Sequence, residues 1–220
     1  SVLTQTYTDN FENLREGLEN LKRDFSKKAI TMTDESAFSL GGNIATTPGK
    51  VIYETDLFQL IHYTPTTKEV FETPLLLIPP MINKYYIMDL QEENSYVKWL
   101  VEQGHTVYLM SWVNPITSSQ NYSFEDYLMN GPLKALTYLE KTEKFKTVNL
   151  IGYCIGGTLL SILLAYLEKK NPLTLTIKSA TFLTTAIDFS SPGELWFFMD
   201  TEEKRHALFS LMEKDGFLAG

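Results

Sequence analysis

The chain has 220 residues, of which 44% are hydrophobic and 13% are aromatic, so it can bury a substantial core and is not intrinsically disordered. Its formal net charge of −8 argues against a nucleic-acid partner, because phosphate binding needs clustered lysine and arginine. The single cysteine, Cys154, excludes a disulfide within the chain and favours a reducing, cytoplasmic setting.

Residues 1–45 are predicted to form an N-terminal helical region. Between residues 11 and 25, apolar residues recur every three or four positions, which predicts an amphipathic helix. A core-facing stripe is the more common role of such a face, and a partner-binding surface is the alternative. The polar stretch with Gly41, Gly42 and residues 46–49 then predicts a loop.

The next part of the chain begins with two strands joined by a short polar turn, which predicts an antiparallel pair. A continuous apolar strand follows and must stop at Pro79 and Pro80. A helix closed by Gly104 and a β-branched, aromatic strand come next. These elements are expected at residues 51–53, 58–63, 75–78, 96–103 and 106–112.

Further along, Ser123 and Asp126 have the spacing of a capping box, which opens a helix towards Lys144 with a kink or break at Pro132. A strand at 148–151, a helix to Lys170 and a strand at 177–183 follow. This alternation predicts a mostly parallel sheet covered on both faces, the three-layer sandwich of the α/β-hydrolases, over residues 46–190. The apolar run 159–167 is too short to span a membrane.

The most informative motif lies between that strand and that helix, where the sequence reads Gly-Tyr-Cys-Ile-Gly-Gly over residues 152–157. It has the pattern of a nucleophile elbow with cysteine in the place of serine. Gly152, Gly156 and Gly157 meet the need for small residues where strand and helix pass closely. A lone buried cysteine is often only a small hydrophobe, but its position at this turn favours a catalytic role for Cys154.

A thiolate is the attacking form of cysteine, and the start of the following helix stabilises an anion at that point. The backbone N–H of Ile155 is placed to stabilise an oxyanion. A second donor is expected from the loop after the strand at 75–78, which spans residues 79–84, although this loop is equally explained as a rigid turn.

Several separated stretches resemble one family, the polyhydroxyalkanoate synthases, and most closely its class I members. The stretches are residues 46–51, 59–67, 79–90, 111–115, 123–127 and 152–158. The resemblance implies a Cys-Asp-His triad with Cys154 as nucleophile and Ile155 and Ile82 as the oxyanion donors. It implies that the substrate is a 3-hydroxyacyl-CoA, with 3-hydroxybutyryl-CoA as the favoured member, and that the product is a growing polyester. No cofactor and no metal are expected. It also implies a homodimer associated with polymer granules.

The resemblance places the triad aspartate and histidine beyond the end of this chain, so the fold is expected to be incomplete at its C-terminus and the segment alone inactive as a polymerase. His206 lies in a charged run that predicts an exposed helix, while His62 and His105 are expected to be packed. Asp188 is expected to be a turn residue. Residues 191–220 are predicted to begin a cap, or else to be ordinary packing.

Two other functions fit the same residues. A cysteine-dependent hydrolase of esters or thioesters would use water in place of a hydroxyl acceptor, and fold does not choose between the two. A non-catalytic domain that binds granules or a partner is the third reading, against which the intact elbow glycines argue.

Overall fold

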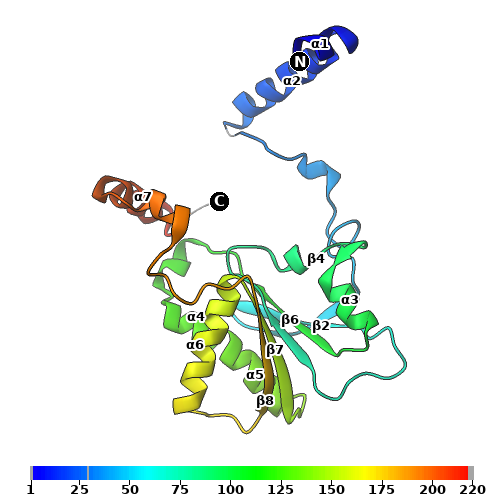
Figure 1. Ribbon diagram of the computed structural model, residues 1–220, viewed down its shortest axis with the longest axis vertical. Helices are drawn as coiled ribbons and strands as arrows, with labels where there is room; N and C mark the ends of the chain where they lie inside the picture. The colour runs from blue at the N-terminus through cyan, green and yellow to red at the C-terminus, as the bar shows by residue number, and fades with distance from the viewer. Residues whose placement is uncertain (1, 29, 218–220) are drawn as a thin grey trace. The chain divides into compact units, whose positions relative to one another are not determined.

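The structure is a computed structural model, and it describes residues 2–28 and 30–217. The chain divides into two compact units, Ser1–Gly42 and Asn43–Gly220, which are described separately. Figure 1 shows the elements of both units.

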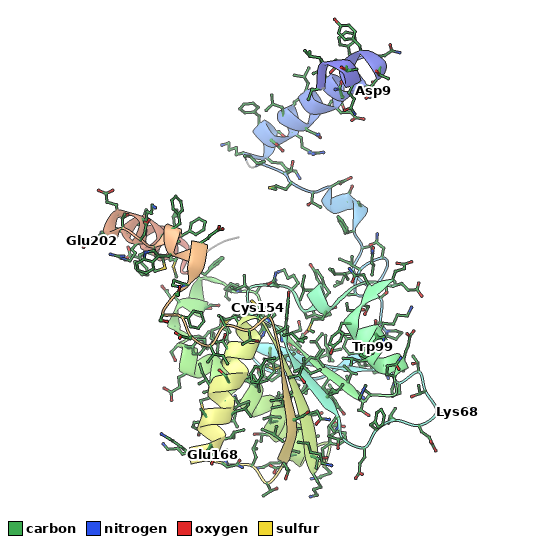
Figure 2. All side chains as sticks on the ribbon, viewed as in Figure 1. Asp9, Lys68, Trp99, Cys154, Glu168 and Glu202 are labelled. Atoms are coloured by element: carbon green, nitrogen blue, oxygen red, sulfur yellow. The ribbon has the colours of Figure 1, made fainter. Side chains whose placement is uncertain are left out.

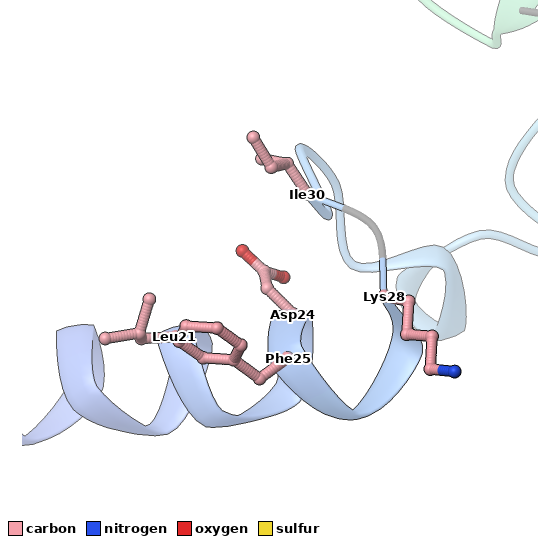
Figure 3. Close-up of a pocket in the computed structure, with 5 residues that line it drawn as sticks. All are labelled: Leu21, Asp24, Phe25, Lys28 and Ile30. Atoms are coloured by element: carbon pink, nitrogen blue, oxygen red, sulfur yellow. The ribbon is translucent and has the colours of Figure 1, made fainter.

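The first unit contains helices α1 (Val2–Thr8) and α2 (Glu12–Lys27) and the short 3-10 helix η1 (Glu35–Ala37). The amphipathic helix is confirmed, whereas α1 was not predicted. No residue of α2 is buried, and Phe25 is 76% exposed, so the described residues of this unit do not cover the apolar stripe and its role stays a prediction. Near its C-terminal end, α2 borders a groove lined by Leu21, Asp24, Phe25, Lys28 and Ile30 (Figure 3).

The second unit is built on a six-stranded sheet of order β1-β2-β6-β3-β7-β8. The pairings β1·β2 and β2·β6, at one side of the sheet, are antiparallel, while β6, β3, β7 and β8 are parallel to one another. The strands are β1 (Gly49–Glu54), β2 (Phe58–Tyr63), β3 (Leu75–Ile78), β6 (Val107–Trp112), β7 (Thr147–Tyr153) and β8 (Thr176–Leu183). The mostly parallel sheet is therefore confirmed.

Helices cover both faces of this sheet (Figure 1). On one face, α4 (Phe124–Asn130), α5 (Pro132–Lys141) and α6 (Ile155–Lys169) pack on fully buried strand residues such as Leu76 and Leu150. On the other, α3 (Tyr96–Glu102) packs on Leu77 and Leu109. This three-layer arrangement confirms the predicted α/β-hydrolase-type fold.

The predicted helix from Ser123 is divided in two, and the capping box of Ser123 and Asp126 is present. The division falls at Gly131, where an added Cβ would lie 2.2 Å from the carbonyl oxygen of Tyr127 and 2.6 Å from the ring of Trp112. Pro132 then starts α5 without needing a backbone donor.

A small hairpin of β4 (Asp89–Gln91) and β5 (Asn94–Ser95) was not predicted. The fully buried Asp89 accepts hydrogen bonds from the hydroxyls of Thr47 and Ser95, each at 2.6 Å. The remaining elements are the 3-10 helices η2 (Tyr85–Met88), η3 (Thr117–Asn121) and η4 (Gly193–Phe198), and helix α7 (Glu202–Asp215).

The turn between α6 and β8 is attached to α5 through Glu140. Its Oε1 accepts from the hydroxyl and backbone N–H of Thr174, each at 2.5 Å, and from the N–H of Leu175 at 2.8 Å. These bonds, with the Thr174 hydroxyl first, lower the pKa of Glu140. The turn is thereby fixed before it leads into the strand beside β7.

Glu140→Gln is expected to lower the free energy of unfolding at pH 7 by about 1 kcal/mol, since a charged acceptor is lost at a partly exposed site. Because the pKa of Glu140 is lowered in the folded state, its contribution to stability is fully present above pH 4.5, the ordinary pKa of glutamate. This contribution disappears as the pH falls through the folded-state pKa. Urea unfolding should therefore show the free energies of unfolding of wild type and Glu140→Gln converging as the pH is lowered from 7. A difference that stays constant with pH would contradict a stabilising role of the Glu140 charge.

Candidate active site

Cys154 occupies a sharp turn between β7 and α6. Its φ of 54° and ψ of −124° lie in a region that non-glycine residues rarely adopt. The turn is held by its own backbone: the Cys154 carbonyl accepts from the N–H of Gly157 at 2.9 Å and of Thr158 at 3.2 Å. The side chain of Cys154 is exposed at the end of the sheet where α6 begins (Figure 2).

Close backbone packing explains the glycines at 152 and 156. A Cβ on Gly152 would lie 2.5 Å from the Cα of Gly157. A Cβ on Gly156 would lie 2.2 Å from the carbonyl oxygen of Ile78 and 2.7 Å from that of Pro79. The start of α6 can therefore pack this closely against β3 and β7 only if residues 152 and 156 lack side chains, as the sequence predicts.

The far side of the elbow lies against the segment that follows β8. The N–H of Cys154 donates to the carbonyl of Leu183 at 2.9 Å, and the Thr158 hydroxyl donates to that of Ala186 at 2.7 Å. A Cβ on Gly157 would lie 2.0 Å from Oγ1 of Thr185. Residues 183–186 thus form one wall of the turn.

The loop after β3 lies on the other side, because Ile78 is the register partner of Gly152. Ile82 in this loop is 81% exposed. The carbonyl of Pro79 accepts from Nε1 of Trp112 at 2.8 Å, and Nζ of Lys84 donates to Oδ1 of Asn114 at 2.5 Å. The loop is thereby connected to the end of β6.

At the start of α6, the N–H of Ile155 belongs to the first helical residue, which has no carbonyl within the helix to accept it. The partial positive charge of a helix N-terminus adds to this donor. The geometry can therefore present a thiol beside a backbone donor, which is the arrangement required for attack on a carbonyl carbon.

The two packed histidines lie at the other end of the sheet. His105 precedes β6, and His62 in β2 pairs with Tyr108 near the start of β6, whereas Cys154 follows the carboxyl end of the parallel strand β7. His62 stacks on Tyr108 with ring centroids 4.5 Å apart, and burial lowers its pKa. Nε2 of His62 and Nδ1 of His105 are buried without hydrogen-bond partners, so neither ring atom is bonded to Cys154.

The third histidine, His206, is exposed on α7, where Nδ1 lies 3.4 Å from the Ser210 hydroxyl. Asp188 is also exposed and accepts from the N–H of Ser190 at 2.8 Å, a turn contact that lowers its pKa. The sequence-based view of His206 as a surface residue and of Asp188 as a turn residue agrees with these positions. Among the described residues, no histidine is hydrogen-bonded to Cys154.

The segment predicted to begin a cap contains η4 and α7. Its aromatic side chains Trp196, Phe197 and Phe198 are all more than half exposed, and Nζ of Lys204 lies 3.6 Å from the Phe197 ring centroid. The cap assignment for residues 191–220 stays a prediction, and residues 218–220 lie outside the described residues.

Within residues 2–28 and 30–217, no helix combines the length and apolar character needed to cross a membrane. The same described residues contain no group of three or more acidic, cysteine or histidine side chains arranged to hold a metal ion.

Sequence reasoning missed two contributors to the elbow, Trp112 and Thr185. A signal existed for Trp112, because a tryptophan ending a buried strand needs an acceptor for its indole N–H. Nothing in the sequence distinguishes Thr185 from its neighbour Thr184, because the contact with Gly157 depends on the path of the chain after β8.

Comparisons with known proteins identify relatives of this chain. Residues 1–100 match the family model described as the poly-beta-hydroxybutyrate polymerase (PhaC) N-terminus. A poly(3-hydroxyalkanoate) polymerase from Methylorubrum extorquens is 41% identical over 223 residues, which cover 100% of this chain. The chain is thus similar along its whole length to the poly(3-hydroxyalkanoate) polymerases. The polymerase subunit PhaC from Cupriavidus necator is 43% identical over 86% of the chain.

The chain spans about a third of these polymerases, 36% of the first and 32% of the second. Among solved structures, an esterase from Pyrococcus furiosus is similar with a TM-score of 0.48 and 12% identity, covering 83% of this chain and 66% of that one. The fold assignment rests on the strand order, the layers and the elbow described above.

Proposed function

We propose that this chain supplies the nucleophile of a poly(3-hydroxyalkanoate) polymerase and that Cys154 carries the acyl chain as a thioester. The observation that carries the proposal is the exposed cysteine held at a φ of 54° between β7 and α6. The names of the relatives support the reaction class. The substrate class is 3-hydroxyacyl-CoA, with 3-hydroxybutyryl-CoA as the favoured member.

In the first step, the Cys154 thiolate attacks the carbonyl carbon of the CoA thioester. A tetrahedral oxyanion forms, the bond to the CoA sulfur breaks, and CoA leaves as a thiol after taking up a proton. In the second step, the hydroxyl oxygen of another hydroxyacyl unit attacks the acyl-cysteine, loses its proton to a base, and releases the Cys154 thiolate. One thioester is replaced by another in the first step, so the acyl group stays activated for ester formation.

The backbone N–H groups of Ile155 and Ile82 are the proposed donors to the oxyanion. Ile155 contributes from the N-terminus of α6 and Ile82 from the exposed loop after β3. The base and its orienting carboxylate are proposed to come from a part of the polymerase outside this chain, since none of its three histidines is hydrogen-bonded to Cys154. Dimerisation and granule association stay predictions from the family resemblance.

The decisive experiment incubates the full-length protein with 3-hydroxybutyryl-CoA and follows CoA, polymer and free hydroxy acid together. We expect CoA release with insoluble polyester, and a 3-hydroxybutyryl adduct on the peptide that contains Cys154. Mass spectrometry after rapid acid quenching identifies the modified residue.

Two results would contradict the proposal in different ways. CoA release with free hydroxy acid and no polymer would indicate a cysteine-dependent thioesterase on the same fold. Polymer formation with the adduct on another residue would leave the reaction intact but remove Cys154 as nucleophile.

A further inference from the structure

The loop that carries Ile82 is attached at both of its ends to one short segment. At its start, the Pro79 carbonyl accepts the buried hydrogen bond from Nε1 of Trp112 at 2.8 Å. At its end, Nζ of Lys84 donates to Oδ1 of Asn114 at 2.5 Å. The exposed Ile82 lies between these two attachments, which come from residues two positions apart at the end of β6.

The indole ring of Trp112 is itself held firmly. The residue is 8% exposed, and its ring lies 6.3 Å from the Phe58 ring and 5.6 Å from the Tyr127 ring, measured between centroids. A Cβ on Gly131 would come within 2.6 Å of the Trp112 ring, so the helix break at Gly131 makes room for it. The single donor of the indole is therefore fixed in its direction towards Pro79.

The Pro79 carbonyl also adjoins the first turn of α6. An added Cβ on Gly156 would lie 2.7 Å from this oxygen, so the start of the helix and the start of the loop are in contact there. Pro80 has no backbone N–H, and the loop cannot donate a hydrogen bond at that position. The indole N–H consequently fixes the Pro79 carbonyl, where the loop that carries Ile82 meets the helix that carries Ile155.

We propose that Trp112 is a positioning residue for the oxyanion donors, with the Lys84–Asn114 pair as a second attachment of the same loop. The inference rests on the proposed function, because it assigns the loop to oxyanion stabilisation. Donors act through their preorganisation, and a displacement of about 1 Å costs up to about 100-fold in rate. Trp112 thus acts through Ile82 and does not contact the substrate.

The test compares two reactions of Cys154 in the full-length protein. Acylation by the 3-hydroxybutyryl thioester of N-acetylcysteamine passes through a tetrahedral oxyanion, whereas alkylation by iodoacetamide displaces iodide and forms no oxyanion. Trp112→Phe removes the indole donor while keeping an aromatic ring, and Lys84→Met removes the ammonium group while keeping an unbranched stem. Lys84 is exposed, so its variant folds even where Trp112→Phe does not.

We expect Trp112→Phe to slow acylation about 10- to 100-fold and Lys84→Met about 10-fold or less, with alkylation within about twofold of wild type. Asn114→Asp keeps an acceptor for Lys84 and should acylate at nearly the wild-type rate. The matched controls Trp99→Phe, 52% exposed on α3, and Lys134→Met, exposed on α5, should leave both reactions unchanged.

Equal slowing of acylation and alkylation would reveal a general structural role and overturn the proposal, as would unchanged acylation in both variants. A defect of Lys84→Met seen with the CoA thioester but not with the N-acetylcysteamine thioester would place Lys84 on the phosphates of CoA and overturn its positioning role. Failure of the proposed function itself looks different, since wild-type Cys154 would then not be acylated at all.

Discussion

Replacing Cys154 with glycine is expected to abolish acyl transfer and to raise the free energy of unfolding by about 1 kcal/mol. The backbone at this position, with φ of 54° and ψ of −124°, costs a non-glycine residue about 1–3 kcal/mol. Glycine removes that strain but loses more conformational entropy on folding, about 0.5–1 kcal/mol. The difference leaves a net gain, and urea unfolding of the full-length variants measures it.

Cys154→Ala is the matched control, because it removes the thiol but keeps the Cβ that causes the strain. Its stability should stay near that of wild type, while acyl transfer falls at least about 10⁴-fold, as expected for the loss of a nucleophile. A glycine variant less stable than the alanine variant would show that the turn stores no strain. Acyl transfer retained by either variant would locate the nucleophile elsewhere.

Gly156→Ala is expected to destabilise the second unit by about 3 kcal/mol, at the upper end of the usual cost of overpacking. The new methyl group would lie 2.2 Å from the carbonyl oxygen of Ile78, which belongs to a central strand. That oxygen cannot move without shifting β3 against both of its neighbours. Thermal and urea unfolding, followed by circular dichroism, should show the loss together with loss of acylation.

A comparison with Gly157→Ala tests the steric reason. There the obstacle is a side chain, Oγ1 of Thr185 at 2.0 Å, so the added substitution Thr185→Gly should restore part of the lost stability. No side-chain substitution should restore Gly156→Ala, because its obstacle is backbone. Rescue of both variants by Thr185→Gly would contradict the packing described for Gly156.

The elements that position Cys154 could be predicted from the sequence because their signals are local. The apolar run before Gly152, the glycine spacing and the apolar helix after Cys154 each constrain the same few residues. The stop of β3 at Pro79 and the division at Pro132 also follow from proline's missing donor. These positions agree with the structure to within a residue or two.

Other features depend on contacts between distant residues and could not be predicted in this way. The hairpin β4–β5 is held by the hydrogen bonds of Asp89 to Thr47, 42 positions away, and to Ser95. The bond between Trp112 and Pro79 spans 33 positions. The role of the α2 stripe stays open between core packing and a partner surface, because periodicity identifies an apolar face but not what covers it.

The contacts between the elbow and residues 183–186 connect two processes, the ordering of this segment and the proposed acylation of Cys154. The N–H of Cys154 is bonded to Leu183 and the Thr158 hydroxyl to Ala186, so a change in the order of this segment alters the stability of the turn that bears the thiol. If the order of this segment changes the free energy of the proposed acylation of Cys154, acylation must change the free energy of ordering the segment by the same amount. Under the proposed function, the chain that leads into η4 and α7 is therefore expected to respond to acylation of Cys154.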